Sequence, residues 1–86
     1  MTSNAKAELL AVYLERRPAL VRFFATRTGC PDRAEDIVQD IYVRLQALPE
    51  TSAREIANPA AFLYRIGGNL MLDGVRRRQR ASARDQ

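Results

Sequence analysis

Residues 58–80 read NPAAFLYRIGGNLMLDGVRRRQR, with a helix start at one end and a run of arginines at the other. Asn58 followed by Pro59 favours a helix start, because asparagine caps free amide groups and proline's missing donor costs nothing at the first helical position. Apolar side chains then recur at three- and four-residue steps, which is the spacing of one helix face. We predict a helix to about Gln79, and beyond it, at 81–86, a flexible tail or the start of an interdomain linker.

The two sides of this helix differ in chemistry. The side expected to face the core carries Phe62, Leu63, Ile66, Leu70 and either Asp73 or Gly74. A neighbouring flank and the run that extends it form our candidate DNA-binding surface, made of Arg65, Asn69, Arg76, Arg77, Arg78 and Arg80. Arginine neutralises phosphate, and arginine and asparagine can both reach base edges. The alternative is a solvated basic helix end that complements the helix dipole.

A second helix is predicted upstream, where residues 32–45 read DRAEDIVQDIYVRL. Asp32 and Glu35 have the spacing of a capping box, so we expect this helix to run from Asp32 to about Leu48, where Pro49 stops it. Its apolar face consists of Ala34, Ile37, Val38, Ile41, Leu45 and Leu48. The opposite face carries Asp32, Asp36, Gln39, Asp40 and Val43.

The remaining segments complete an all-α fold. From about Ala5 to Arg27, an apolar stripe predicts another helix, with Pro18 causing a kink or a short break near Arg16 and Arg17. That stripe contains Leu9, Leu10, Tyr13, Leu20, Val21 and Phe24. Residues 49–57 lack strong periodicity and are expected to form an exposed loop. We therefore predict a compact bundle of three main helices in a single domain over residues 1–80.

The amino-acid composition limits the classes of protein to which this chain can belong. The chain has 86 residues, 47% hydrophobic and 28% charged, a mixture that fits one globular domain and neither a disordered chain nor a membrane span. Its start lacks the pattern of a secretion signal, so we expect a cytoplasmic protein with no direct membrane insertion. Lys and Arg exceed Asp and Glu by five to two in residues 1–31 and by six to two in residues 57–86, whereas the acids prevail by six to three in residues 32–56. The chain is thus acidic in the middle and basic at both ends.

Residue types that usually carry catalysis are scarce. Histidine is absent, which removes the usual general base and the commonest transition-metal ligand. Cys30 is the single cysteine, so no internal disulfide or cysteine metal cluster can form. We expect neither an enzyme nor a cofactor, metal site or small-molecule substrate.

The acidic face of the second helix has three interpretations. It could be a solvated helix side, a docking surface for a basic partner, or a divalent-metal site. The last would make the chain a metal-dependent nuclease that uses Asp32, Glu35, Asp36 and Asp40. A metal site needs ligands that converge from a second element, and no other part of the sequence has a carboxylate cluster.

Together, residues 32–45 and 58–77 resemble region 2 of the extracytoplasmic-function (ECF) sigma factors. The shared features are an acid-rich helix, an intervening loop, and a helix with Phe62-Leu63, Asn69 and Asp73 four residues apart, and an arginine run. The resemblance covers nearly the whole chain. It implies promoter −10 element recognition and DNA melting as part of the RNA polymerase holoenzyme, with an anti-sigma factor as the resting-state partner.

The resemblance also implies residue roles. Residues of the acidic helix dock on the clamp helices of the RNA polymerase beta-prime subunit, namely Glu35, Asp36, Gln39, Asp40 and Arg44. The DNA-binding residues given above contact the unwound −10 strand. A base flipped from the stack is held by the loop, through Glu50, Thr51, Ser52, Ala53, Arg54 and Glu55. Asp73 is assigned a structural role, holding a nearby arginine or a helix end.

Several features depart from the family pattern. Many relatives have tryptophan where this chain has Phe62, and Gly67 and Gly68 stand where alanine and a longer side chain are usual; a close backbone approach or a bend is expected there. Phe62 with Leu63 is similar to the iron-starvation members, which a membrane-bound anti-sigma factor controls. The family's second domain, which reads the −35 element, has no counterpart, so we expect an excised or truncated domain. The runner-up function is a stand-alone helix-turn-helix repressor, with its turn at Gly67-Gly68.

Overall fold

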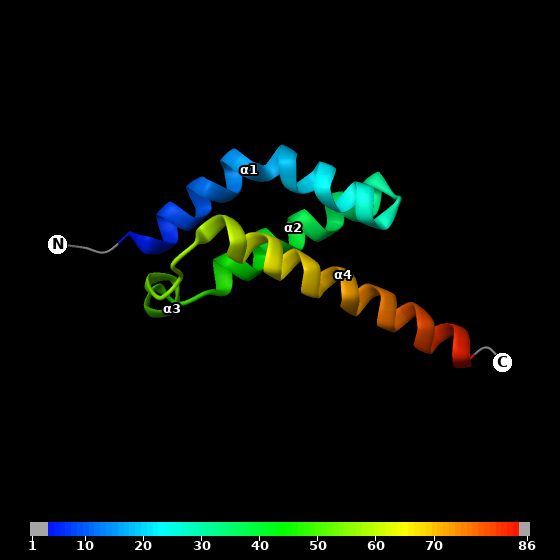
Figure 1. Cartoon of the computed structure of the whole chain (residues 1–86). Coiled ribbons are helices and arrows are strands. Elements are labelled where there is room, and N and C mark those ends of the chain that lie inside the picture. Colours follow the sequence, from blue (N-terminus) through cyan, green and yellow to red (C-terminus); the bar gives the residue numbers. More distant parts are fainter. Residues whose placement is uncertain (1–3, 85–86) are drawn as a thin grey trace.

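The computed structural model describes residues 4–84, and their side chains as far as Arg77. Four helices follow one another: α1 (Ala5–Thr28), α2 (Pro31–Ala47), α3 (Glu50–Arg54) and α4 (Pro59–Arg84) (Figure 1). No strand occurs in residues 4–84. The predicted all-α class with three main helices is therefore confirmed.

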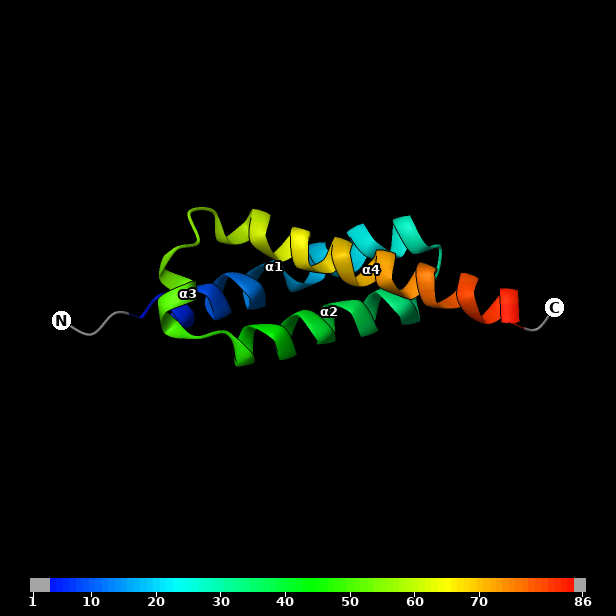
Figure 2. The ribbon, with the colours of Figure 1, turned by 90° about the horizontal axis from the view of Figure 1, so that it is seen from below.

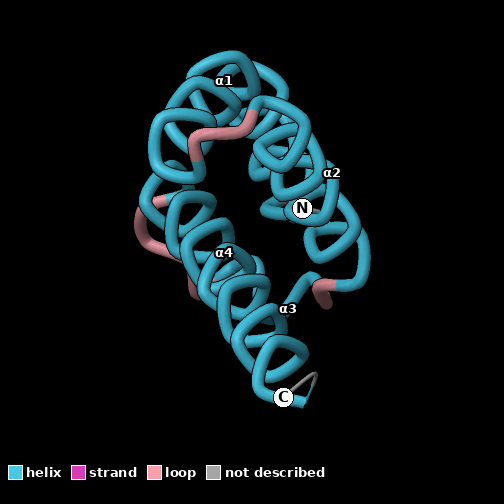
Figure 3. Tube along the Cα trace, turned by 90° about the vertical axis from the view of Figure 1, so that its right-hand side faces the viewer, coloured by secondary structure: helices cyan, strands magenta, loops and turns pink. Residues whose placement is uncertain are grey.

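The three long helices pack side by side. α1 and α2 form an antiparallel pair, and α4 packs along both of them, antiparallel to α2 and in the same direction as α1 (Figure 1). A view along the bundle shows α1, α2 and α4 surrounding a common centre (Figure 3). The C-terminal part of α4 projects beyond the turn between α1 and α2 (Figure 2). The basic end of α4 thus stands clear of the other helices.

The centre of the bundle contains the residues that the periodicity predicts. Its buried members in the described chain are Leu9, Tyr13, Leu20 and Phe24 of α1, Ala34, Ile37, Val38, Ile41 and Leu45 of α2, and Leu63 of α4. Leu10, Val21, Leu48, Phe62, Ile66 and Leu70 pack against this core while remaining partly exposed. Asp73 is exposed and Gly74 is half-buried, so of these two alternatives Asp73 was the wrong one.

Gly67 determines how closely α4 approaches the other two long helices. A Cβ atom built on Gly67 would lie 2.3 Å from Cζ of Phe24 and 3.1 Å from Cδ1 of Ile41. Both distances are shorter than ordinary carbon contacts, so a larger residue does not fit here without displacing the core. The close backbone approach expected at this glycine is present. At Gly68, by contrast, an added Cβ would meet no atom within 4 Å.

α1 continues through Pro18 without a break, so of the two alternatives predicted near Arg16 and Arg17, a kink or a short break, the break is wrong. Pro18 cannot donate a hydrogen bond to the carbonyl of Leu14 one turn earlier. Both residues are exposed, and water can hydrate that carbonyl on the outer side of the helix. Figure 1 shows α1 arched over the other helices, which is the bend that an interior proline favours.

The start of α2 differs from the prediction. α2 begins at Pro31 with Cys30 as its N-cap, so the capping box of Asp32 and Glu35 is wrong. Proline is well suited to the first helical position, because its fixed φ is already helical and its missing N–H would have no partner there. It therefore moves the helix start one residue upstream of Asp32.

The region between α2 and α4 is not the exposed loop predicted for residues 49–57, because Glu50–Arg54 form helix α3. The predicted cap of α4 is confirmed, since Asn58 Oδ1 accepts a hydrogen bond of 3.1 Å from the amide of Ala61. α4 continues to Arg84, past the end expected near Gln79. No helix in the described part of the chain is long and apolar enough to cross a membrane.

Candidate functional site

The acidic face of α2 is exposed along its length. All five residues predicted to dock on a partner are exposed, and four of them share helical spacing: Gln39 and Asp40 lie three and four residues after Asp36, and Arg44 lies four residues after Asp40. This spacing places them on one side of the helix. Val43, which is 59% exposed, lies on the same side and adds an apolar contact to it.

Glu35 differs from the other four. Its carboxylate forms a 3.0 Å ion pair with Arg17 of α1, and this hydrogen bond raises the pKa of the Arg17 guanidinium above its usual value. The two side chains are 51% and 42% exposed, so the pair contributes about 1 kcal/mol or less to stability. Glu35 therefore joins α1 to α2, and the polymerase role predicted for it competes with this contact.

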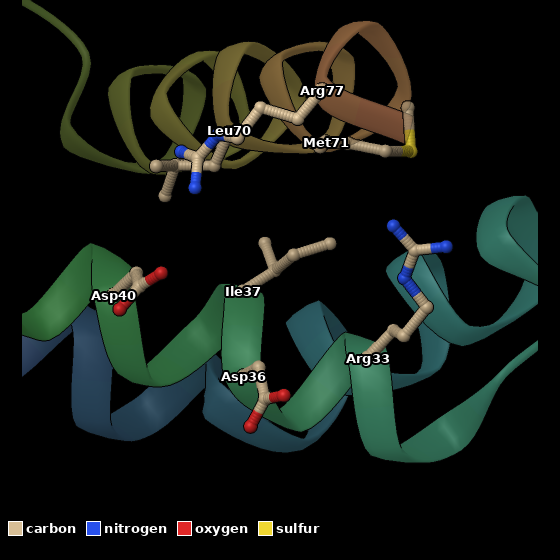
Figure 4. A pocket seen from close by; sticks show the side chains of 8 residues that line it. Arg33, Asp36, Ile37, Asp40, Leu70, Met71 and Arg77 are labelled. Atoms are coloured by element: carbon tan, nitrogen blue, oxygen red, sulfur yellow. The ribbon is translucent and has the colours of Figure 1, made fainter. Parts of the chain in front are cut away.

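A groove of about 200 Å³ separates the acidic face from α4. It is lined by Arg33, Asp36, Ile37 and Asp40 of α2 and by Leu70, Met71, Gly74 and Arg77 of α4 (Figure 4). Opposite charges face each other across it, yet among the described side chains no ion pair joins Asp36 or Asp40 to Arg33 or Arg77. The carboxylates and guanidiniums of this groove therefore do not neutralise one another by direct contact.

The cationic flank of α4 faces solvent. Arg65, Asn69 and Arg76 are exposed, as the helical spacing predicts, and Leu72 beside them is 50% exposed. Arg77 is also exposed but lines the groove next to α2, so it is turned away from the other three. The predicted contacts of Arg78 and Arg80 lie outside the described side chains.

Residues of α3 were predicted to hold a base, and two of them have structural contacts within the domain. The carboxylate of Glu50 accepts hydrogen bonds from the backbone amides of Ala5 (2.8 Å) and Lys6 (3.0 Å), which caps the start of α1. A negative charge at a helix N-terminus also interacts favourably with the helix dipole. Ala53 is only 5% exposed and packs inward.

The remaining residues of that segment border a second hollow. This α3–α4 pocket has a volume of about 370 Å³ and is lined by Ser52, Glu55, Ile56, Ala57, Ala61, Phe62 and Arg65. Of the predicted base-holding residues, Ser52 and Glu55 line it, whereas Thr51 and Arg54 are exposed outside it. The pocket brings Arg65, predicted from the α4 flank, together with part of the predicted loop.

A third hollow, which we call the α1–α4 pocket, was not predicted from the sequence. Its volume is about 390 Å³, and its lining is mostly apolar and aromatic, consisting of Phe23, Phe24, Arg27, Tyr64, Arg65, Gly68, Asn69, Met71 and Leu72. The only sequence signal was the four-residue spacing of Phe23 and Arg27 on α1, which places them on one helix side. Which part of α4 they would meet depends on tertiary packing.

The continuity of α4 decides between the two DNA-binding alternatives. The helix runs unbroken through Gly67 and Gly68, so there is no turn at these glycines and the helix-turn-helix repressor is ruled out. A comparison with protein families agrees, because the profile of the family "Sigma-70 region 2" matches residues 12–81. The chain belongs to the sigma-70 region 2 family.

Membership gives this sigma-70 region 2 domain a sigma-factor role in promoter recognition during transcription initiation, with core RNA polymerase and promoter DNA as partners. No curated protein and no solved structure matches the chain. The match begins inside α1 and extends over α2, α3 and nearly all of α4, so it includes every predicted site residue.

The nuclease alternative finds no support in this sigma-70 region 2 domain. Its four carboxylates belong to Asp32, Glu35, Asp36 and Asp40, all on α2, and Glu35 is turned towards Arg17. Among the described residues, no group of three or more acidic, cysteine or histidine side chains is arranged to hold a metal ion. Sigma-70 region 2 is a transcription initiation family and not a catalytic one.

Proposed function

We propose that the sigma-70 region 2 domain described here is that of an ECF sigma factor, which binds core polymerase through α2 and the unwound −10 strand through α4. The observation that carries the proposal is that an acidic and a basic surface lie side by side on two helices, without direct ion pairs across the groove between them. Both surfaces therefore remain available for partners of opposite charge.

For the polymerase, the proposal uses the acidic face, which consists of Asp36, Gln39, Asp40 and Arg44. These side chains are exposed on one rigid helix, and they would meet the clamp helices of the beta-prime subunit. A helix whose core side is fully packed holds such contacts in a fixed arrangement, which lowers the entropy cost of binding. Glu35 takes part only if its ion pair with Arg17 opens.

For DNA, the proposal uses Arg65, Asn69 and Arg76 on the exposed flank. Arg77, Arg78 and Arg80 lie on the same continuous helix, and Arg77, which lines the groove next to α2, would contact the strand from that side. Arginine contacts to phosphates supply affinity, and Arg65 and Asn69 offer hydrogen bonds to base edges.

The α3–α4 pocket is our candidate for holding a flipped base. Phe62 offers it an aromatic surface, and Ser52, Glu55 and Arg65 offer polar groups to its edge. Flipping costs a few kcal/mol of stacking and pairing, which such pocket contacts must offset. The pocket retains Ser52 and Glu55 from the six residues predicted for this role and adds Phe62.

An anti-sigma factor is the proposed partner in the resting state. The support is that both functional surfaces are exposed in the chain by itself, so a protein that covers them would block polymerase and DNA together. By resemblance at Phe62 and Leu63 we extend the proposal to the iron-starvation subgroup, with a membrane-bound anti-sigma factor and a cytoplasmic location for this domain.

The polymerase contact is tested by Asp40→Arg. Placing a cation against a basic partner costs several kcal/mol, so we expect the affinity for core polymerase to fall at least about tenfold. The matched control is Glu15→Arg, which makes the same charge change at an exposed position of α1. Affinity is measured by fluorescence anisotropy with core enzyme, and thermal unfolding checks the fold. Equal binding by the two variants would remove α2 from the interface.

The DNA contact is tested by Arg76→Ala, with Arg16→Ala on α1 as the control arginine. Binding of fork-junction DNA is measured with core polymerase at several salt concentrations. Loss of one phosphate contact should flatten the plot of log affinity against log salt by about 0.7 to 0.9 units. If the slope of Arg76→Ala equals that of the native chain, this arginine makes no phosphate contact.

A further inference from the structure

The α1–α4 pocket is a hollow to which neither the sequence nor the proposed contacts assign an occupant. We propose that it takes a second unstacked nucleobase of the single strand, held between Phe23 and Arg27 of α1 and Tyr64 and Asn69 of α4. This inference rests on the proposed DNA-binding function. It goes beyond that function because it makes α1 part of the nucleic-acid surface.

The aromatic wall of the pocket is held in place by the core. The rings of Phe23 and Tyr64 meet edge to face, with centroids 4.9 Å apart and planes at 76°. Phe23 also meets Phe24 edge to face at 5.0 Å, and Phe24 is completely buried. Arg27 lies over one face of the Phe23 ring, but the edge-to-face contact leaves a face of Tyr64 that Phe23 does not cover, so a flat ligand can stack there. Because the rings are already fixed, little side-chain entropy is lost when a base binds.

The rim of the pocket is positively charged, which suits the negative phosphates of a nucleic acid. The Cζ atom of Arg27 lies 4.3 Å from the centroid of the Phe23 ring, a cation–π contact that orients the guanidinium beside the aromatic wall. Arg65 and Asn69 face it from α4. Proteins bind single strands through this combination, in which aromatic side chains stack on bases and arginines contact the backbone.

The other two hollows differ in charge from this one. Asp36 and Asp40 line the groove between α2 and α4, and Glu55 lines the α3–α4 pocket. The residues that line the α1–α4 pocket include no carboxylate. Of the three, it therefore repels a phosphate least, and its mainly apolar lining suits a base from which water has been removed.

Arg65 connects the two proposed base sites. It lines both the α3–α4 pocket and the α1–α4 pocket, so the hollows lie on two sides of one arginine. A strand that contacts Arg65 through a phosphate could place one base in each hollow. The sites would then act together on the same strand.

Gly68 provides a variant that fills the pocket without removing any contact. It lines the hollow, and a Cβ built on it would meet open space. Gly68→Leu should therefore occupy the pocket while keeping α4 helical, because leucine is a better helix former than glycine. Phe23→Leu removes the stacking ring and keeps an apolar side chain. Arg22→Ala, an exposed arginine of α1 outside the pocket lining, is the matched control.

The experiment uses this chain with core polymerase and fork-junction DNA whose unwound strand carries 5-iodouracil at one position at a time. We expect photocrosslinks to Phe23 or Tyr64 at one position, read by mass spectrometry. Stacking contributes about 1 to 3 kcal/mol per base, so Gly68→Leu and Phe23→Leu should weaken DNA binding roughly 5- to 150-fold. Arg22→Ala should bind like the native chain.

The outcomes separate this inference from the proposed function. If Gly68→Leu and Phe23→Leu bind DNA normally while Arg76→Ala does not, the second base site is refuted and the α4 surface stands. If none of these variants changes DNA binding, both proposals fail. If Gly68→Leu and Phe23→Leu weaken only the capture of core polymerase, the pocket holds a protein segment, and the inference is overturned.

Discussion

Replacing Gly67 with alanine tests the close packing of α4 against Phe24 of α1 and Ile41 of α2. In the structure, the added Cβ would lie 2.3 Å from Cζ and 2.5 Å from Cε2 of Phe24. Ordinary contacts between such atoms begin at 3.4 Å, so the ring or the helix must move by 3.4 − 2.3 = 1.1 Å. Phe24 is completely buried and is fixed by edge contact with Phe23.

The change in the free energy of unfolding caused by Gly67→Ala has two opposing contributions. Overpacking of a well-packed core costs about 1 to 3 kcal/mol, and a displacement of more than 1 Å at a fixed ring favours the upper end. Alanine gains about 1 kcal/mol of helix stability over glycine. We expect Gly67→Ala to lower the free energy of unfolding by a net ~2 kcal/mol, or the melting temperature by roughly 8 to 16 °C for a domain of this size.

The control is the next residue along the chain. Gly68→Ala makes the same chemical change where the new Cβ meets no atom within 4 Å, so it should raise stability by about 1 kcal/mol. Urea unfolding followed by circular dichroism measures both variants. If Gly67→Ala is as stable as Gly68→Ala, α4 does not pass this close to α1, and the geometry of both base pockets is wrong.

A double-mutant cycle locates the clash. Phe24→Leu removes the ring atoms nearest the new methyl group, so it should cost less in the Gly67→Ala background than in the native chain. Residues in contact typically show coupling energies of about 0.5 to 3 kcal/mol. A coupling near zero would show that the methyl group is accommodated elsewhere.

Two further predictions concern the contacts that join α1 to its neighbours. Glu50→Ala removes the acceptor for the amides of Ala5 and Lys6 and should destabilise the domain by about 1 kcal/mol, whereas the exposed Glu55→Ala should change stability by less than ~0.5 kcal/mol in urea unfolding. Tyr13 donates a buried 2.9 Å hydrogen bond to the carbonyl of Val38, so Tyr13→Phe should cost about 1 kcal/mol at pH 7. Burial raises the pKa of the Tyr13 hydroxyl, so its contribution is present below the unfolded value of about 10 and is lost as the pH rises through the native value. The free energies of unfolding of the native chain and of Tyr13→Phe are compared from pH 7 to pH 11. A difference that stays constant over this range would contradict the prediction.

The helices, and the side each one buries, follow from the sequence because they depend on local spacing. The apolar steps through Ile37, Ile41 and Leu45 and the cap at Asn58 involve residues within a few turns of one another. The exposed positions of Asp36, Asp40, Arg65 and Asn69 follow from the same periodicity.

The secondary-structure predictions were wrong where two local signals competed, or where contacts between residues far apart in the sequence determine the structure. Asp32 and Pro31 both favour a helix start, and proline, being the earlier of the two, takes the first position. α3 has five residues, too few to show a helical period, and Glu50 links it to the start of α1. Whether Pro18 breaks α1 depends on which side of the helix faces water.

The sequence by itself determined the helix faces, the segregation of charge and membership of a sigma-70 region 2 family, because these depend on residue types at fixed spacings along one chain. Only the tertiary structure decided which carboxylate would be paired, through Arg17 and Glu35, and which aromatic rings would share a pocket, through Phe23 and Tyr64. The members of each pair come from different helices. Their distance depends on how closely those helices pack, which Gly67 sets in the case of α1 and α4.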